Sequence, residues 1–574
     1  MKQHKLRKYL DNLAGFFIPV VQVFKTWFRN HAGVLVFLVL PVIYLLNAYG
    51  VHHSLGAFYL GSVDPEYFYL YNGVIVSEGN LSIQYFAHPG TPVHFLVAAS
   101  SRIIELFQPG DYATDVVNDP EKYIHAANLL LNVLVSLVLV FCGVFAKKYS
   151  GSYFAALMIQ LSPFGSSALL GMSGRLIPEA LMMIPLLLTC LMIIKYVFDK
   201  NRDKVSVSYL VIFGIIIGFG TACKLSFAPV LLVPLILLKL SARQRIRLVL
   251  YSILFFAVFA YPVLFNMNEY WEWVSGMFTH SGKYGGGEKN VIDLSTIPGN
   301  LNYLYRYNRE FFFIAGVSLL LTGLYSFRPF REKGTSQSRI IRAILAVNMT
   351  IIVSIAFTLK HFALYYFMPF SLFKYLLVLL IAMLIIQHQK ISLSKAYRAI
   401  ILSVFSLIIL IMTFSQVKEV RASIARSSQR SELLRQEYGK ITAMVDKNKP
   451  IIMSAPYYGA PFIEFAHYNG FIMSRHLKVF FRQVLKEKYP MSFQYVNWSD
   501  KFYFWDDFVD FRQILKKTNT SFYIYTGKDK GNDLEAIENR IWQVLDKNTV
   551  TRKVLFQNDD TREQLIEIIV NTGK

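Results

Sequence analysis

Residues 126–146 read AANLLLNVLVSLVLVFCGVFA, and Lys147 and Lys148 follow directly. This stretch carries no charged side chain. A helix rises 1.5 Å per residue, so a helix of this length is about 30 Å long and matches the hydrocarbon core of a bilayer. The stretch therefore predicts a membrane-spanning helix, and the two lysines place its far end at the cytoplasmic side.

Comparable apolar runs recur over the first three quarters of the 574-residue chain, of which 54% is hydrophobic and only 17% charged. The composition predicts an α-helical polytopic membrane protein. We expect about 11 transmembrane helices, near residues 33–50, 126–146, 152–170, 176–198, 208–222, 225–239, 248–265, 311–327, 340–358, 363–387 and 397–414.

The net charge of +22 suggests a nucleic-acid partner at first sight. Most basic residues, however, lie in short segments between apolar runs, where they act as orientation signals. We therefore predict no nucleic-acid partner. Three cysteines (Cys142, Cys190 and Cys223) lie in or beside apolar runs without metal-ligand spacing, and predict neither a disulfide framework nor a zinc site.

The charge pattern also predicts the domains and their sides. Residues 1–32 form a basic cytoplasmic or interfacial segment, and residues 33–415 form the transmembrane domain with outer loops at about 52–125 and 266–309. Residues 416–574 have shorter apolar runs that alternate with charged stretches, which predicts a soluble extracytoplasmic α/β domain. The bacterial inner membrane is favoured over the endoplasmic reticulum.

The first outer loop begins with Asp64-Pro65-Glu66. One interpretation is structural, with Asp64 as the N-cap and Pro65 as the first residue of an interfacial helix. A capping carboxylate at a membrane surface can also face a cavity, so catalysis remains open. His88 follows in the same loop and is more often structural than catalytic when isolated.

Some basic residues contradict the charge bias, because they lie at the outer ends of helices where cations are rare: Arg175, Lys224, Lys360 and His361. They could reach lipid headgroups by snorkelling. Alternatively they form one pocket for an anionic headgroup, since guanidinium and ammonium groups both bind phosphate well. Several such residues at one level favour the pocket.

The order of these motifs resembles the GT-C superfamily of glycosyltransferases, and the nearest branch is similar to the protein-O-mannosyltransferases and aminoarabinose transferases. The resemblance covers roughly residues 30–415 and rests on short motifs in a fixed order. These are Asp64-Pro65-Glu66-Tyr67, His88-Pro89-Gly90-Thr91-Pro92, Arg175-Leu176-Ile177-Pro178-Glu179, and His361 through Tyr365-Tyr366 to Pro369. His-Pro-Gly replaces the more usual His-Pro-Pro, and Pro65 separates two acids that are adjacent in several members.

The resemblance implies transfer of a sugar from a polyprenyl-phosphate-linked donor to a lipid, glycan or protein acceptor, with inversion at the anomeric carbon. Asp64 would act as general base and Glu66 as the second acid, while the four outer cations would bind the donor phosphate. Glu179 would orient Arg175. His88, Glu179, Tyr284 and Tyr365 complete the substrate-binding set, with Tyr284 in a glycine-rich loop that could close over substrate.

Two further points stay open at this stage. Asp64 and Glu66 could hold a divalent cation through oxygen ligands, although metal-free chemistry is preferred because no third ligand is evident. A transporter or flippase of a lipid-linked saccharide would use the same basic pocket differently. An inactive scaffold, in which the C-terminal domain binds a partner, would leave the outer charges unexplained. Repeated halves and broken helices at the midplane would indicate a transporter, and the sequence shows neither.

Overall fold

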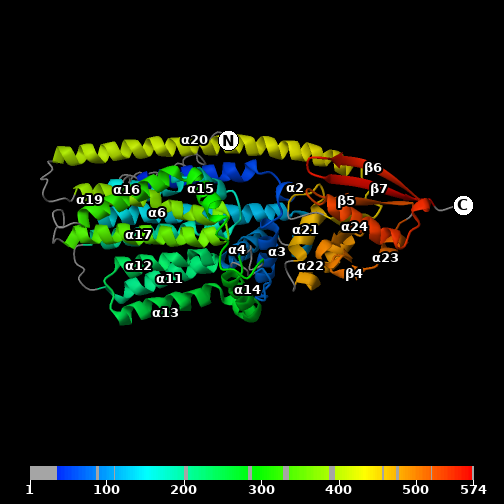
Figure 1. The fold of residues 1–574 in the computed structure, drawn as a ribbon, viewed down its shortest axis with the longest axis horizontal. Coiled ribbons are helices and arrows are strands. Elements are labelled where there is room, and N and C mark those ends of the chain that lie inside the picture. Colours follow the sequence, from blue (N-terminus) through cyan, green and yellow to red (C-terminus); the bar gives the residue numbers. More distant parts are fainter. Residues whose placement is uncertain are drawn as a thin grey trace, which may run out of the picture.

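The computed structural model describes residues 35–85, 89–108, 110–199, 205–281, 287–326, 335–386, 395–454, 458–472, 477–518 and 520–571. A long bundle of helices is followed at one end by a mixed sheet with its own helices (Figure 1). The predicted fold class, a helical membrane protein with a C-terminal α/β domain, is confirmed.

Each of the eleven predicted apolar runs is mostly helical over the part that the structure describes. Within the described residues, length and composition qualify six helices to cross a membrane: Leu35–Ser54, Pro120–Ser150 (α6), Pro178–Phe198 (α9 and α10), Gln337–Lys360 in α17, Leu364–Ile386 (α18 to α19) and Ala399–Ala443 in α20. Ala242–Phe259 (α13) and Tyr261–Thr279 (η3 and α14) add a seventh if the 82° bend between them lies within one span.

The other predicted spans are shorter or less apolar than this test requires. They are Tyr153–Gly165 (α7 and η1), Val207–Cys223 (α11), Leu225–Leu237 (η2 and α12) and Arg309–Ser326 (α16). The physical reason is clearest at Lys224, whose extended backbone ends α11 one residue before η2 begins. The number of spans is therefore lower than predicted on this criterion.

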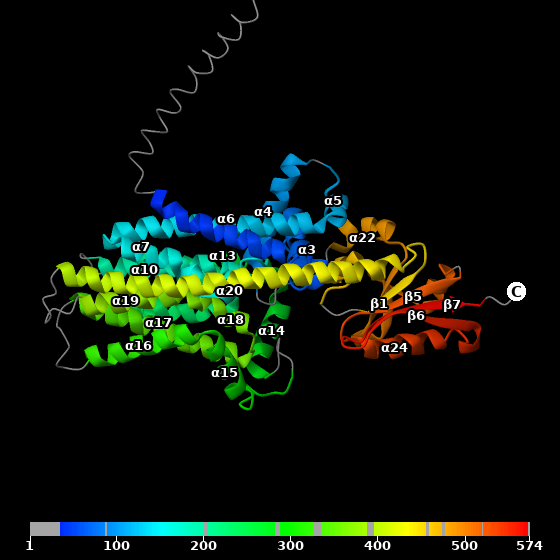
Figure 2. The ribbon, with the colours of Figure 1, turned by 90° about the horizontal axis from the view of Figure 1, so that it is seen from above.

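Helices from both predicted outer loops gather at the end of the bundle that carries the sheet (Figures 1 and 2). These helices are α2 (Phe58–Gly61), α3 (Glu66–Ser77), α4 (Thr91–Phe107), α5 (Tyr112–Asn118), α14 (Met267–Thr279) and α15 (Ile297–Tyr307). Two short helices, α8 (Ser167–Met172) and η5 (Met368–Leu372), precede α9 and α19 in the chain.

One helix joins the two parts of the molecule. Helix α20 runs without a break over Lys395–Ala443, along the bundle and on to the sheet (Figure 2). The predicted boundary at 415/416 falls inside this helix, where the apolar pattern ends and charged residues begin.

The C-terminal domain contains a seven-stranded sheet in the order β4-β3-β2-β1-β5-β7-β6. β1 pairs in parallel with β2 and β5, and the other neighbours are antiparallel. The strands are β1 (Ile451–Ser454), β2 (Ser492–Val496), β3 (Lys501–Phe504), β4 (Asp507–Val509), β5 (Ser521–Thr526), β6 (Val550–Asn558) and β7 (Glu563–Val570), and the helices are α21 (Ile463–Ile472), α22 (Leu477–Lys488), α23 (Phe511–Lys516) and α24 (Gly531–Trp542), with short turns η6 (Asn497–Ser499) and η7 (Lys547–Thr549).

The two faces of this sheet have different neighbours, because side chains alternate along each strand. Ile452 and Ile524 lie in a core shared with α23 and α24. Met453 and Tyr525 face the other way and belong to the same continuous core as the helical bundle. The C-terminal domain is therefore packed onto the membrane part rather than tethered to it.

Candidate functional site

Asp64 lies between α2 and α3. Helix α3 begins at Glu66 with Pro65 at the cap position and no side-chain cap, so the predicted N-cap role of Asp64 is wrong. The Asp64 carbonyl instead accepts hydrogen bonds from Ser62 Oγ at 2.9 Å and from Arg175 Nη2 at 3.0 Å. Its carboxylate has no hydrogen-bond partner among the described residues.

The surroundings of Asp64 make its carboxyl group harder to ionise than that of a free aspartate. Burial and the neighbouring Glu66 carboxylate raise its pKa to about 6, although the charges of Arg175 and Lys224 pull it down. At neutral pH the carboxylate is therefore mainly ionised and has a pKa close to the working pH, which is the property that a general base needs.

Glu66 is fully buried and is bound by Arg175. Arg175 Nη2 lies 2.7 Å from Glu66 Oε2, and Arg175 Nε donates to Oε1. Each Glu66 oxygen thus accepts a hydrogen bond from Arg175. Among the described residues, no group of three or more His, Cys, Asp or Glu side chains is placed to hold a metal ion.

Lys224 is a buried cation, and its partner is Glu179. The prediction that Glu179 orients Arg175 is therefore corrected: Glu179 pairs with Lys224, and Glu66 takes Arg175. Arg175 and Glu179 do not lie on one helix, because the extended Ile177 delays the start of α9 until Pro178.

The ammonium group of Lys224 also lies 3.7 Å from the centroid of the Tyr366 ring and 5.6 Å from that of Tyr365. Its backbone forms an isolated antiparallel bridge with Pro89. The motif His88-Pro89-Gly90 therefore reaches Lys224 through its proline, while His88 itself lies outside the described residues, as does Tyr284.

The departure from His-Pro-Pro at Gly90 has a steric reason. Gly90 has φ of +68°, which proline cannot adopt. A Cβ at this position would also lie 2.9 Å from the Tyr69 hydroxyl. Glycine is therefore the residue that this turn requires.

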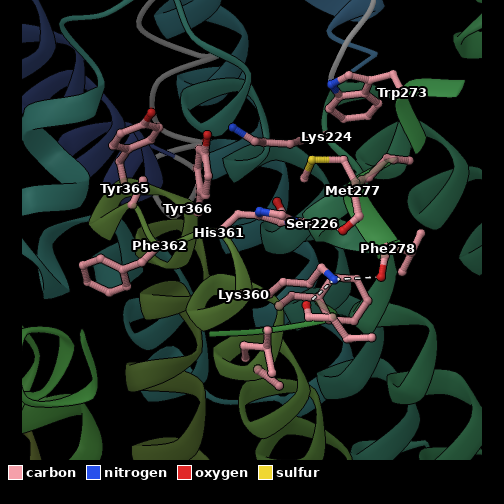
Figure 3. A pocket seen from close by; sticks show the side chains of 16 residues that line it. Lys224, Ser226, Trp273, Met277, Phe278, Lys360, His361, Phe362, Tyr365 and Tyr366 are labelled. Atoms are coloured by element: carbon pink, nitrogen blue, oxygen red, sulfur yellow. Dashed lines mark hydrogen bonds between the residues drawn. The ribbon is translucent and has the colours of Figure 1, made fainter. Parts of the chain in front are cut away.

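Most of the predicted phosphate-binding cations meet at one cavity of about 310 Å³ (Figure 3). Lys224, Lys360 and His361 line it together with Tyr365, whereas Arg175 is not part of its wall. The remaining lining is largely apolar: Leu225, Ser226, Trp273, Met277, Phe278, Val291, Ile292, Ala356, Phe357, Phe362, Ala363 and Tyr366.

Two of these cations also hold the second outer loop. Lys360 Nζ donates to the carbonyls of Phe278 and Val291 at 3.1 and 2.6 Å. His361 Nε2 lies 3.0 Å from the Met277 carbonyl. These hydrogen bonds hold the α14 side of the cavity wall in place. A phosphate bound in the cavity would therefore share Lys360 and His361 with these backbone carbonyls.

Other buried charges were missed in the sequence. Lys374 lies inside the apolar run 363–387 and binds Glu310, and its Nζ donates to the Gly165 carbonyl at 2.9 Å. A lysine within an apolar run is a recognisable signal. Glu121 accepts hydrogen bonds from the Tyr59 amide at 3.2 Å and the Tyr67 hydroxyl at 3.0 Å, and nothing local in the sequence marks it.

No protein-family model matches the chain, and no curated protein matches it. Among solved structures it is similar to ArnT from Cupriavidus metallidurans bound to undecaprenyl phosphate, with a TM-score of 0.44. It is also similar to the apo state of that protein, with a TM-score of 0.47. Each similarity has 11% sequence identity and covers 94% of this chain and 98% of the other. A similarity at this level assigns no residue and no substrate to this chain.

Proposed function

We propose that this protein is a GT-C membrane glycosyltransferase, which moves a hexosyl or pentosyl unit from a polyprenyl-phosphate-linked donor to an extracytoplasmic lipid, glycan or protein. The observation that carries the proposal is the position of Asp64. Its carboxylate has no hydrogen-bond partner among the described residues, and Lys224, which is near enough to lower its pKa, lines the basic and largely apolar cavity.

The cavity suits the two chemical parts of such a donor. Apolar side chains such as Trp273, Met277 and Phe357 offer a surface for an isoprenoid chain. Lys224 and His361 offer positive charge or hydrogen-bond donors to a phosphate. A soluble sugar phosphate would not use the apolar lining, and an uncharged lipid would not use the basic side chains. A lipid-linked phosphate would use both.

The reaction follows from the order of the groups. Asp64 removes the proton from an acceptor hydroxyl or amine, and the freed electron pair attacks the anomeric carbon on the side opposite the phosphate. The bond between the anomeric carbon and the phosphate oxygen breaks, and the polyprenyl phosphate leaves with that electron pair. Lys224 and its neighbours stabilise the charge that develops on the departing oxygen, and the anomeric configuration inverts.

A transporter or flippase of a lipid-linked saccharide is the second candidate, favoured by the same basic cavity. It would not need an ionisable carboxylate with a raised pKa beside the cavity. The two functions therefore differ in what happens when Asp64 loses its charge but keeps its shape.

The test is mass spectrometry of surface glycolipids and glycoproteins from the native host, in a deletion strain complemented with wild type or with Asp64→Asn at matched protein amounts. Asp111→Asn, an exposed acid of the same loop, is the control. We expect one sugar to be missing in the deletion and Asp64→Asn strains and present in the control. A wild-type profile in Asp64→Asn would contradict the proposal and favour the transporter.

A further inference from the structure

A short segment of the C-terminal domain lies against the Asp64 loop. Residues 458–460, here called the strap, run antiparallel to residues 59–62. The amides of Gly459 and Ala460 donate to carbonyl groups of that loop segment at 3.2 and 2.9 Å. An antiparallel bridge pairs the strap with Ser62, whose hydroxyl donates to the backbone carbonyl two residues further on.

The strap approaches the loop so closely that only glycine fits. A Cβ on Gly459 would lie 1.9 Å from the Leu60 carbonyl oxygen and 2.6 Å from the Gly61 nitrogen. At Gly459 it is backbone, not a flexible side chain, that would have to move. A second close approach lies at Gly470 in α21, where a Cβ would lie 2.6 Å from the ring of Tyr71.

Helix α21, which follows the strap, is joined to α3 through a buried polar contact. The Tyr71 hydroxyl and His467 Nδ1 are 2.7 Å apart, and neither side chain reaches solvent. Helix α3 begins two residues after Asp64. A contact that holds α3 in place therefore also holds the end of the segment that carries Asp64. Polar pairs buried in this way specify one arrangement of the surrounding elements.

A third contact holds the far end of the first outer loop. Lys488, the last residue of α22, donates from Nζ to the Val117 carbonyl at 3.0 Å and to Asn118 Oδ1 at 2.6 Å. The C-terminal domain thus contacts the loop at residues 59–62, which precede Asp64, and at Tyr71 and residues 117–118, which follow it. These contacts join residues almost 400 positions apart in the chain.

We propose that the C-terminal domain is a positioning element for the Asp64 loop, in which Gly459, Gly470 and the Tyr71–His467 pair hold the carboxylate in place for the acceptor. This inference rests on the proposed role of Asp64. None of these residues touches the reacting atoms. They act by fixing the backbone of residues 59–71, and a catalytic group displaced by about 1 Å can lose a hundredfold in rate.

The experiment uses the full chain in lipid nanodiscs and measures hydrogen exchange of peptides from residues 59–77, with peptides from α6 as the internal reference. The variants are Gly459→Ala and His467→Ala. The matched control is Gly439→Ala, because a Cβ at Gly439 in α20 meets nothing within 4 Å. The same variants are scored for sugar transfer in the complemented deletion strain.

We expect Gly459→Ala and His467→Ala to speed exchange in the 59–77 peptides about tenfold or more, while exchange in the α6 peptides stays unchanged. Sugar transfer falls about tenfold or more at equal protein amounts. Gly439→Ala behaves as wild type in every measurement.

A double variant separates the hydrogen bond from simple packing. Tyr71→Phe alone leaves His467 without its partner, whereas Tyr71→Phe with His467→Phe replaces both polar groups. Because an unpaired buried polar group costs more than the loss of the whole pair, the double variant should exchange more like wild type than the single one.

Two results would overturn the inference: unchanged exchange in Gly459→Ala, or faster exchange with full sugar transfer. Failure of the proposed function looks different, because Asp64→Asn would then keep full transfer. The exchange measurement does not depend on activity, so the two failures are read from separate data.

Discussion

The guanidinium of Arg175 binds both carboxylate oxygens of Glu66. Each oxygen of Glu66 thus has an Arg175 donor, whereas the Asp64 carboxylate has no hydrogen-bond partner among the described residues. Arg175 also ties the backbone of the loop, because it donates to the Asp64 carbonyl at 3.0 Å. Glu66 is therefore the ion-pair partner of Arg175.

Arg175→Lys tests the pair of parallel hydrogen bonds between Arg175 and Glu66. A lysine keeps the charge but cannot donate in parallel to two carboxylate oxygens. We expect transfer to fall about a hundredfold, or about 2.7 kcal/mol of transition-state stabilisation, in membranes with equal protein amounts. Arg102→Lys is the control, because Arg102 is exposed and pairs with Glu78 and Glu105 at the surface. Equal losses in both variants would contradict a specific role for this pair of hydrogen bonds.

The pH dependence of transfer should follow Asp64. The base must be ionised, and the pKa of Asp64 is raised to about 6 by burial and by the charge of Glu66. The rate is therefore expected to be near its plateau above about pH 7 and to fall as the pH drops through about 6. Glu66→Gln removes a negative charge, so the acid limb should move to lower pH. If the fall in rate at low pH occurs at the same pH in Glu66→Gln as in wild type, the titrating group is not Asp64.

The sequence predicts elements well where the signal is local. The long apolar runs are mostly helical, and the short apolar runs of the C-terminal domain include the strands β1, β5, β6 and β7. Lys224, Lys360 and His361 meet at one cavity because Lys224 directly follows α11, while Lys360 and His361 lie at the end of α17. Periodicity and charge bias are sufficient for such conclusions.

Partner choice is not local, and it was predicted less well. Arg175 and Glu179 are close in sequence but bind different residues, because the chain is extended between them. The strap and its loop are separated by almost the whole membrane domain, so no pattern within either segment indicates their pairing.

The size of the cavity gives a third prediction. Ala356 of α17 lines the cavity, and a larger side chain there would occupy space that the proposed donor needs. We expect Ala356→Phe to raise the apparent KM for a polyprenyl-phosphate-sugar about tenfold while kcat changes little. Met349→Phe on the same helix is the control, since Met349 is 42% exposed outside the cavity. An unchanged KM in Ala356→Phe would place the donor elsewhere.

The close packing of α11 on α13 gives a prediction for stability that also reaches the site. Gly214 and Gly218 lie four residues apart in α11, and a Cβ on Gly218 would be 2.6 Å from the Phe256 nitrogen and from the Phe255 Cβ. Small residues at this spacing let membrane helices approach each other closely. Gly218→Val should force the helices apart and cost about 1–3 kcal/mol, as overpacking does.

Gly316→Val provides the comparison, because a Cβ at Gly316 in α16 meets nothing within 4 Å. Fluorescence-detected size-exclusion chromatography after heating measures the temperature at which half of each variant remains monodisperse. We expect a clear fall for Gly218→Val and little change for Gly316→Val. Since α11 ends one residue before Lys224, Gly218→Val should also reduce transfer below the melting temperature. Full sugar transfer by Gly218→Val below its melting temperature would mean that Lys224 keeps its position without the close packing of α11 on α13.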